Sequence, residues 1–332
     1  MNVHQSAEGI LVEDRETKLF LDPSRQIKPA QGIVGISHAH QDHVRNHKTE
    51  CILTPATSDL FHASEAKRKK HAYGKKTRLD NLVISMHSAN HILGSSQFRI
   101  ENSQVLTYTG DFKLQRSLLY PKCDVIDTDI LIMEATYGSP EYVFPNPDGV
   151  YRDMGLWIKS NPGKNVIIGA YALGKSQELI KALNEMSIVP VTHPSVTQNS
   201  EVYKKHGASI EYIDSESPEG NEVMKQGFVG IVPRHLLKYE FIHGLEMQYM
   251  KPVLTSFVSG WATKYNFGVD KTFILSDHAD FSQLMSYAEL SGAKQIYTVH
   301  GQNHELARQI RKQLGIPAIP LADKAQKTLA EY

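Results

Sequence analysis

The chain has 332 residues, and its 36 Lys and Arg residues are balanced by 36 Asp and Glu residues. A formal net charge of zero excludes binding of nucleic acid through a global positive field, so any such binding must use local patches. Hydrophobic residues make up 41% of the chain, which is enough for one large domain or two moderate ones.

Cysteine content and hydropathy narrow the class of protein further. The two cysteines, Cys51 and Cys123, form no CxxC motif, which excludes a disulfide framework and a thiolate zinc site. No stretch approaches the ~18 apolar residues of a membrane span, and the N-terminal residues lack the apolar region of a signal peptide. We therefore expect a cytoplasmic, reducing location and no membrane partner.

The first predicted strands lead into a cluster of metal-ligand residues. Residues 18–21 form an apolar strand that ends at Asp22, and residues 32–36 lead into the segment SHAHQDH. His38, His40 and Asp42 alternate along an extended backbone and face one side, whereas His43 faces the other. One loop can thus supply two adjacent metal ions. Imidazole and carboxylate ligands without thiolate favour Zn²⁺ or Mn²⁺ in an open site.

A basic segment follows at residues 67–78, with seven Lys or Arg residues and one aromatic residue. One interpretation is a solvated helix end and turn. The other is a path for nucleic-acid phosphates, in which Lys69 and Lys70 bind phosphate and Tyr73 stacks on a base. The sequence leaves both interpretations open.

Further apolar strands end at polar residues. Residues 82–86 precede His91 and Ser95, residues 105–110 precede Asp111, and residues 129–133 precede Glu134. Near the C-terminus, residues 272–275 and 296–299 lead to His278 and His300. Because strand ends gather ligands in α/β enzymes, we expect these side chains to meet. Seven of the candidates are the right number for two metals that share one carboxylate: His38, His40, Asp42, His43, His91, Asp111 and His300.

The middle of the chain has a different pattern. Residues 140–149 are rich in Pro and Gly and predict a linker. Strands at 165–168, 187–191 and 227–232 and a helix at 177–186 then predict a small inserted α/β domain. The acidic stretch 211–222 predicts a solvated loop. We therefore expect one domain formed by residues 1–148 and 256–332, interrupted by an inserted domain at 149–255.

Seven ordered motifs make the chain similar to a known family. They are LFLDPS at Asp22, HAHQDH at residues 38–43, SANHILGSS at His91, YTGDF at Asp111, EATYG at Glu134, SDHADF at His278 and TVHG at His300. Over nearly its full length the chain resembles the β-CASP group of metallo-β-lactamase-fold nucleases. Within that group it looks most like the ligase-associated DNA exonucleases and the archaeal messenger-RNA 3′-end processing factors.

The resemblance implies a fold, a reaction and partners. The expected fold is a metallo-β-lactamase αββα sandwich with an inserted small α/β β-CASP cap. The expected function is that of a two-metal phosphodiesterase that hydrolyses single-stranded DNA or RNA in a cleft between the catalytic domain and the cap. A DNA exonuclease in DNA repair is the main interpretation, and an RNA-processing endonuclease or exonuclease is the alternative. Proteins of DNA repair or RNA processing would then be its partners.

The resemblance also implies roles for the residues of the site. One metal, Zn²⁺ or Mn²⁺, would be held by His38, His40 and His91. The second would be held by Asp42, His43 and His300, and Asp111 would bridge both. Asp22 would orient a ligand. The implied catalytic residues are Asp42, Glu134 and His278. Glu134 and His278 would protonate the leaving group, and a supporting role for metal ligands is the alternative. Ser95 joins the substrate-binding candidates.

Three other functions fit the sequence less well than a nuclease. Residues 169–176, GAYALGKS, match the phosphate-binding loop of P-loop ATPases. The strand that could supply the second ATPase motif precedes this loop instead of following it, so we expect Lys175 and Ser176 to bind nucleic-acid phosphate. A catalytically dead binding subunit would have lost ligands, and every position is filled here. A small-molecule hydrolase would not need the inserted domain.

Overall fold

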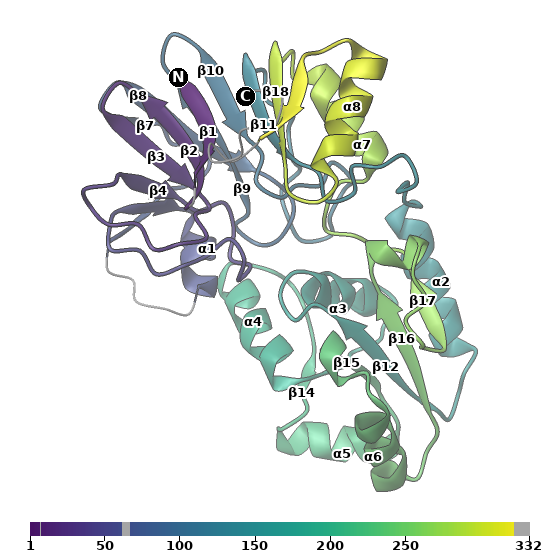
Figure 1. Ribbon diagram of the computed structural model, residues 1–332. Helices are drawn as coiled ribbons and strands as arrows, with labels where there is room; N and C mark the ends of the chain where they lie inside the picture. Colours follow the sequence, from purple (N-terminus) through teal and green to yellow (C-terminus); the bar gives the residue numbers. More distant parts are fainter. Residues whose placement is uncertain (7, 62–66, 322–332) are drawn as a thin grey trace. The chain divides into compact units, whose positions relative to one another are not determined.

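A computed structural model describes residues 1–6, 8–61 and 67–321 (Figure 1). The described chain forms two compact units. The first unit comprises residues 1–116, 120–141 and those from 278 onward, and the second comprises residues 117–119 and 142–277. The chain therefore passes back from the second unit to the first between Asp277 and His278.

A six-stranded mixed sheet begins the first unit, with the strands in sequence order. Strands β1 to β3 are antiparallel, and β3 to β6 are parallel. Their bounds are β1 (Asn2–Ser6), β2 (Gly9–Asp14), β3 (Thr17–Leu21), β4 (Ile33–Gly35), β5 (Cys51–Leu53) and β6 (Arg68–Lys70). The short helix α1 (Pro55–Leu60) follows β5.

The second sheet of this unit has seven strands in the order β19-β18-β11-β10-β9-β8-β7. Strands β10, β11, β18 and β19 are parallel, and the β7 to β10 side is antiparallel. The bounds are β7 (Thr77–Leu79), β8 (Leu82–Ser88), β9 (Ser96–Glu101), β10 (Val105–Tyr108), β11 (Ile130–Glu134), β18 (Gln295–Val299) and β19 (Ala318–Pro320). Helices α7 (Phe281–Leu290) and α8 (Asn303–Leu314) lie beside this sheet (Figure 1).

Side-chain alternation along the strands builds the layers of the first unit. Inward residues of the first sheet, such as Val12 and Leu19, pack against Phe98 and Ile100 of the second. On its other face the second sheet packs against α7 and α8, for example through Leu131, and the first sheet buries Phe20 and Val34 under loop residues. The predicted sandwich of two sheets is confirmed.

The second unit is an α/β fold around a six-stranded parallel sheet in the order β14-β13-β15-β12-β16-β17. Its central strand β12 is buried along its whole length, as expected for a parallel strand covered on both faces. The strands are β12 (Asn165–Ala170), β13 (Val191–Thr192), β14 (Ile213–Asp214), β15 (Val229–Pro233), β16 (Val253–Val258) and β17 (Lys271–Phe273). The helices are α2 (Pro147–Lys159), α3 (Lys175–Glu185), α4 (Pro194–Lys205), α5 (Pro218–Gln226) and α6 (Tyr239–Tyr249), with single turns η1 (Arg234–Leu236) and η2 (Gly260–Thr263). The predicted inserted α/β fold is confirmed.

Four local expectations differ from the structure. The strand predicted at 187–191 forms only at Val191–Thr192, as β13. The prediction of a loop throughout 211–222 is wrong at Ile213–Asp214, which pair with β13 as β14. It is also wrong from Pro218 onward, because Ser217 accepts a hydrogen bond from the Gly220 amide at 2.9 Å and starts α5. Helix α2 begins inside the predicted linker in the same way, with Asn146 as its N-cap. The second unit extends from 142 to 277 because β17 pairs with β16, so it reaches beyond the range 149–255 that was predicted for the inserted domain.

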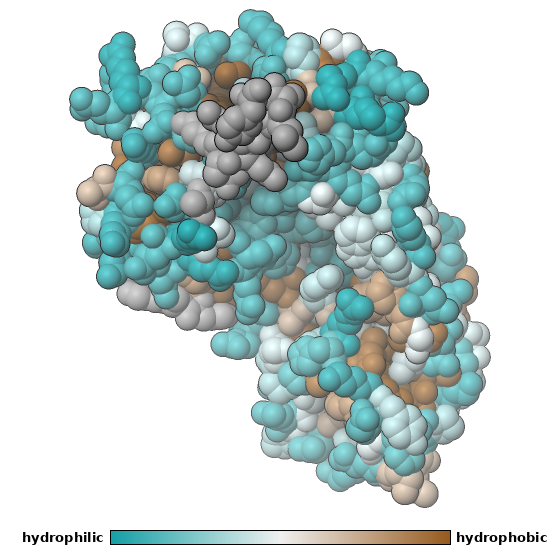
Figure 2. Space-filling model, viewed as in Figure 1, coloured by the Kyte–Doolittle hydropathy of each residue, from teal (hydrophilic) through white to brown (hydrophobic). Residues whose placement is uncertain are grey.

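Surface character differs between the two units in the face shown by Figure 2, where hydrophobic residues gather on the second unit. Exposed apolar side chains of this unit include Tyr239, Met247 and Met250 at α6. Among the described helices, none combines the length and the apolar character that a bilayer span requires.

Candidate metal centre

The candidate ligands lie in segments that follow strands of the two sheets in the first unit. His38 and His40 come after β4, His91 lies between β8 and β9, and Asp111 comes after β10. The Ser96 amide donates to the Ser37 carbonyl at 2.9 Å, which ties the segment after β4 to the start of β9. Segments far apart in the sequence are thus brought to one place by the pairing of the strands that precede them.

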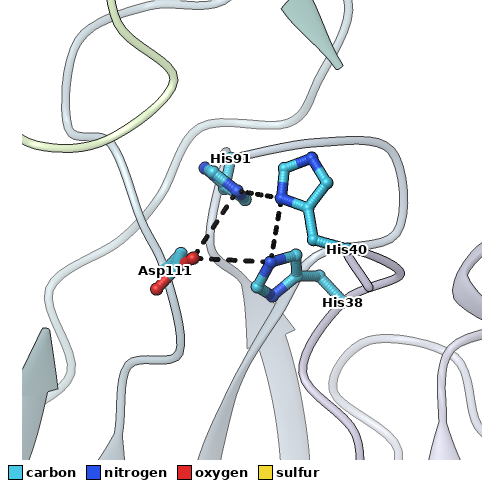
Figure 3. A group of neighbouring side chains, drawn as sticks. All are labelled: His38, His40, His91 and Asp111. Atoms are coloured by element: carbon cyan, nitrogen blue, oxygen red, sulfur yellow. Dashed lines mark hydrogen bonds and ion pairs between the residues drawn. The ribbon is translucent and has the colours of Figure 1, made fainter. Parts of the chain in front are cut away.

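Three imidazoles and one carboxylate converge on a single point (Figure 3). The His40 Nδ1 atom lies 3.2 Å from His38 Nε2 and 3.0 Å from His91 Nε2. The Asp111 Oδ2 atom lies 3.4 Å from His38 Nε2 and 3.8 Å from His91 Nε2. A tetrahedral ion with ligands at about 2.0–2.1 Å has ligand–ligand edges of about 3.3 Å. The donor set therefore fits a divalent metal ion.

The cysteines take no part in this cluster. Both are buried and free. Burial raises the pKa of Cys51 to about 11 and that of Cys123 to about 12, so both thiols stay protonated at neutral pH. The site chemistry is therefore that of nitrogen and oxygen ligands.

The predicted second set of ligands is centred on His43. Its Nε2 atom lies 3.3 Å from Asp111 Oδ2 and 3.7 Å from Asp42 Oδ2. The ring of His300 lies 5.6 Å from the His43 ring, measured between centroids. Asp42 and His300 are exposed, whereas His43 and Asp111 are buried. Asp111 thus contacts both sets, and the ligand group that includes His43 is completed by Asp22 and His38, whereas Asp42 and His300 stand outside the groups of ligand atoms found among the described residues.

Asp22 contacts the second set of ligands through the His43 ring. Its Oδ2 atom lies 2.8 Å from His43 Nδ1 and accepts a hydrogen bond from the Tyr108 hydroxyl at 2.9 Å. Its Oδ1 atom accepts from the Ser37 amide at 2.7 Å. A carboxylate on the far nitrogen of a metal-binding imidazole fixes the ring and its tautomer. Burial, followed by the Asp22 charge, raises the pKa of Tyr108, so the phenol remains a donor.

The buried carboxylates and imidazoles of the cluster shift one another's pKa values. Burial opposes ionisation of Asp111, but the surrounding imidazoles, His43 first among them, hold its pKa well below the usual range. Burial alone would lower the pKa of His43, yet Asp111 and Asp22 raise it well above its ordinary value. Burial and the charge of His43 lower the pKa of His38. These shifts favour the charged form of Asp111 and the neutral form of His38, which are the forms that bind metal, whereas they favour the protonated form of His43.

Glu134 and His278 form a pair next to this cluster. The Glu134 carboxylate is fully buried, and its Oε1 atom accepts a hydrogen bond from the Phe112 amide at 2.8 Å. The His278 Nδ1 atom lies 3.0 Å from Glu134 Oε2 and 4.0 Å from Asp111 Oδ2. The His278 ring stands 4.5 Å from that of His91. His278 thus turns Nδ1 toward Glu134 and keeps part of its surface accessible.

Two of the predicted substrate-binding residues adjoin the His91 segment. The Ser95 hydroxyl accepts hydrogen bonds from the amides of His91 at 3.0 Å and Ile92 at 3.2 Å, which shapes the turn that presents His91. The Tyr73 hydroxyl donates to the Ser95 carbonyl at 2.8 Å, while 38% of the tyrosine is exposed. Tyr73 therefore has a fixed position beside the ligand loop.

The other predicted substrate-binding residues have partners within the protein. Lys69 lies 2.7 Å from Glu50 and Lys70 lies 3.3 Å from Asp59, measured between Nζ and carboxylate oxygen. Both lysines are on strand β6, so the interpretation of this segment as a helix end is wrong. In the second unit, Lys175 and Ser176 are buried at the start of α3.

Sequence reasoning assigned no role to Ser37, Tyr108 or Asp277. Ser37 and Tyr108 hold Asp22, and Asp277 forms an ion pair with Lys175. Ser37 directly precedes His38, and Tyr108 and Asp277 lie in the motifs YTGDF and SDHADF, so these positions were the available signal. Their partners lie far away in the sequence, so spacing alone did not reveal them.

Comparisons with known proteins agree with this arrangement. Residues 268–320 match the family model described as "Zn-dependent metallo-hydrolase RNA specificity domain". A "Probable DNA ligase" of Opitutus terrae is 31% identical over 89% of this chain and 29% of its own length. An "RNase J-like protein" of Methanocaldococcus jannaschii is 33% identical over 38% of this chain and 31% of its own length. The chain thus spans about a third or less of these curated relatives.

A solved structure supports the fold alone. A protein of unknown function from Enterococcus faecalis V583 superposes with a TM-score of 0.65 over 96% of both chains, at 13% sequence identity. The two-sheet sandwich, the inserted α/β unit, the family match and these relatives lead to one assignment. The chain belongs to the β-CASP group of the metallo-β-lactamase-fold family.

Proposed function

We propose that this protein is a two-metal-dependent phosphodiesterase that hydrolyses single-stranded nucleic acid. The observation that carries the proposal is the convergence of His38, His40, His91 and Asp111 at metal-ligand spacing, directly beside the Glu134–His278 pair. Phosphodiester hydrolysis needs both parts, because charge develops on the phosphoryl oxygens while an alkoxide leaves.

The geometry supports the ligands of the first ion, and those of the second follow from the resemblance to the family. His38, His40 and His91 would hold one divalent ion, and His43, Asp42 and His300 would hold the other, with Asp111 shared. Zn²⁺ or Mn²⁺ suits this set of imidazoles and carboxylates. Bound cations would supply Lewis acidity that neutralises phosphoryl charge and makes water a stronger nucleophile.

His278 is assigned as the acid that protonates the leaving oxygen. The Glu134 carboxylate accepts a hydrogen bond from Nδ1 of His278. Nε2 is therefore the ring nitrogen that can contact a substrate. Because Glu134 is itself fixed by the Phe112 amide, the imidazole orientation is set before substrate binds. Asp42 would complete the catalytic set as a ligand of the second metal.

Single-stranded DNA, cut from an end during DNA repair, is the main substrate assignment. It is supported by the long match to a relative named as a DNA ligase. RNA processing is the second candidate. The matched family model is described as an RNA specificity domain and its residues 268–320 include His278 and His300. Partners would be proteins of DNA repair or of RNA processing, respectively.

The ATPase interpretation loses its support from the geometry of residues 169–176. The Ser176 hydroxyl donates to the Tyr171 carbonyl at 2.7 Å, and Lys175 Nζ lies 3.0 Å from Asp277 Oδ1. A phosphate-binding loop needs this serine for Mg²⁺ and this lysine for phosphate. Both side chains are committed to partners inside the second unit.

The first prediction tests the reaction. End-labelled single-stranded and double-stranded DNA and RNA should be incubated with the protein and Mn²⁺ or Zn²⁺, and the products followed over time. We expect degradation of at least one single-stranded substrate and a loss of at least 100-fold for His40→Ala, since it removes a ligand. His243→Ala, on the exposed face of α6, is the matched control and should keep full activity. Intact substrates under all conditions would contradict the proposal.

The second prediction concerns the shared carboxylate. Asp111→Ala should bind fewer than two metal equivalents, because Asp111 contacts ligands of both predicted ions. The measurement is metal content by mass spectrometry after stripping and reloading. Asp129→Ala, which removes a surface partner of Lys294, should keep the wild-type metal content. Two full equivalents in Asp111→Ala would refute the bridging assignment.

The third prediction separates acid catalysis from metal support. His278→Ala should keep both metals and lose about 10²–10⁴-fold in turnover, the usual contribution of a general acid. A substrate with sulfur in the leaving bridging position needs little protonation, so it should restore most of the rate. Loss of metal together with no rescue would assign His278 to support of the ligands instead.

A further inference from the structure

A buried ion pair at the start of helix α3 has no role in the reaction described above. Lys175 Nζ lies 3.0 Å from Asp277 Oδ1, and the two side chains are only 3% and 6% exposed. Both residues belong to the second unit. Desolvation offsets most of the attraction within such a pair, so a buried ion pair is weak evidence for stability and is better attested as a device that fixes one conformation.

Hydrogen bonds within the loop that precedes α3 fix the position of Lys175 next to Asp277. Gly174 has φ of 93°, in the left-handed region, and its amide donates to Gln177 Oε1 at 2.8 Å. Ser176 and Gln177 both bond back to carbonyls of the preceding loop, at 2.7 Å to Tyr171 and 3.0 Å to Ala172. The loop is therefore closed on itself, and the first four residues of α3 are buried.

Asp277 stands directly before His278 in the chain, at the crossing from the second unit to the first. On the other side of His278, the Ala279 amide donates to the Phe112 carbonyl at 2.6 Å. Asp280 accepts from the Gln283 amide at 2.9 Å and caps α7. His278 is thus anchored just after its own position by backbone and cap contacts, and just before it by the ion pair with Lys175.

We propose that Lys175 is a positioning residue for His278 and acts through Asp277. This inference rests on the proposed function, because it takes His278 as the acid of the reaction. Proton transfer requires the donor within hydrogen-bond reach of the leaving oxygen, and small displacements of a catalytic group reduce the rate strongly. With Lys175 removed, Asp277 loses this ion-pair partner, and the backbone that leads into His278 loses the anchor that the pair provides.

The experiment compares Lys175→Met with Lys181→Met on the same helix. Lys181 pairs with Glu185 at the surface, so its replacement controls for the loss of one charge from α3. Each variant is assayed with the oxygen-leaving and the sulfur-leaving substrate. We expect kcat of Lys175→Met to fall about 10-fold or more on the oxygen substrate, up to the about 10²–10⁴-fold that loss of the general acid itself would cost. KM and metal content should change little, the sulfur substrate should restore the rate, and Lys175→Arg should retain most of it.

A purely structural role gives a different pattern. It would lower the rates on both substrates equally, and that result, or an unchanged kcat in Lys175→Met, would overturn the inference. If Lys175→Met folds poorly, the double variant Lys175→Met with Asp277→Leu removes both charges and carries the same prediction, since a buried apolar pair is tolerated.

Hydrogen exchange separates this inference from the function on which it rests. In Lys175→Met the backbone amides of residues 275–280 should exchange faster than in the wild type, whereas in Lys181→Met they should not. Unchanged exchange in Lys175→Met overturns the positioning role whatever the activity. Faster exchange, together with a His278→Ala variant that the sulfur substrate fails to rescue, overturns the acid role of His278 and leaves the anchor itself in place.

Discussion

The buried carboxylate of Asp111 is the constraint on which the site depends. It lies within 4 Å of nitrogens from four histidines, His38, His43, His91 and His278. A charge removed from water needs a partner of opposite sign. A protonated His43, whose pKa Asp111 and Asp22 raise, or a divalent metal ion can be that partner for Asp111.

The fold supplies this arrangement through strands that end at one place. Glu134 ends strand β11, Asp22 directly follows β3, and Asp111 comes three residues after the end of β10. Hydrogen bonds fix two of these carboxylates. The Ser37 amide and the Tyr108 hydroxyl donate to Asp22, and the Phe112 amide donates to Glu134. Ligands held by backbone amides and buried side chains keep their orientation, so little rearrangement is needed when metal or substrate binds.

Much of the fold and of the candidate site was predictable, for identifiable reasons. The alternation of HAHQDH and the polar residues after apolar strands marked the cluster, because the chemistry of metal ligands restricts residue types and strands restrict spacing. Helix α5 was not predicted, because the acidic composition of residues 211–222 is typical of a solvated loop, although Ser217 and Pro218 form a regular helix start. The Lys175–Asp277 pair could not be found from sequence, because 102 positions of numbering separate partners that only the folded chain brings within 3.0 Å.

Zinc K-edge X-ray absorption of the Zn²⁺-loaded protein tests whether imidazoles and carboxylates of the first unit bind the metal without thiolate. We expect nitrogen and oxygen ligands at about 2.0–2.2 Å and a change in this shell in His40→Ala. A sulfur shell at about 2.3 Å, or a spectrum that His40→Ala leaves unaltered, would contradict it.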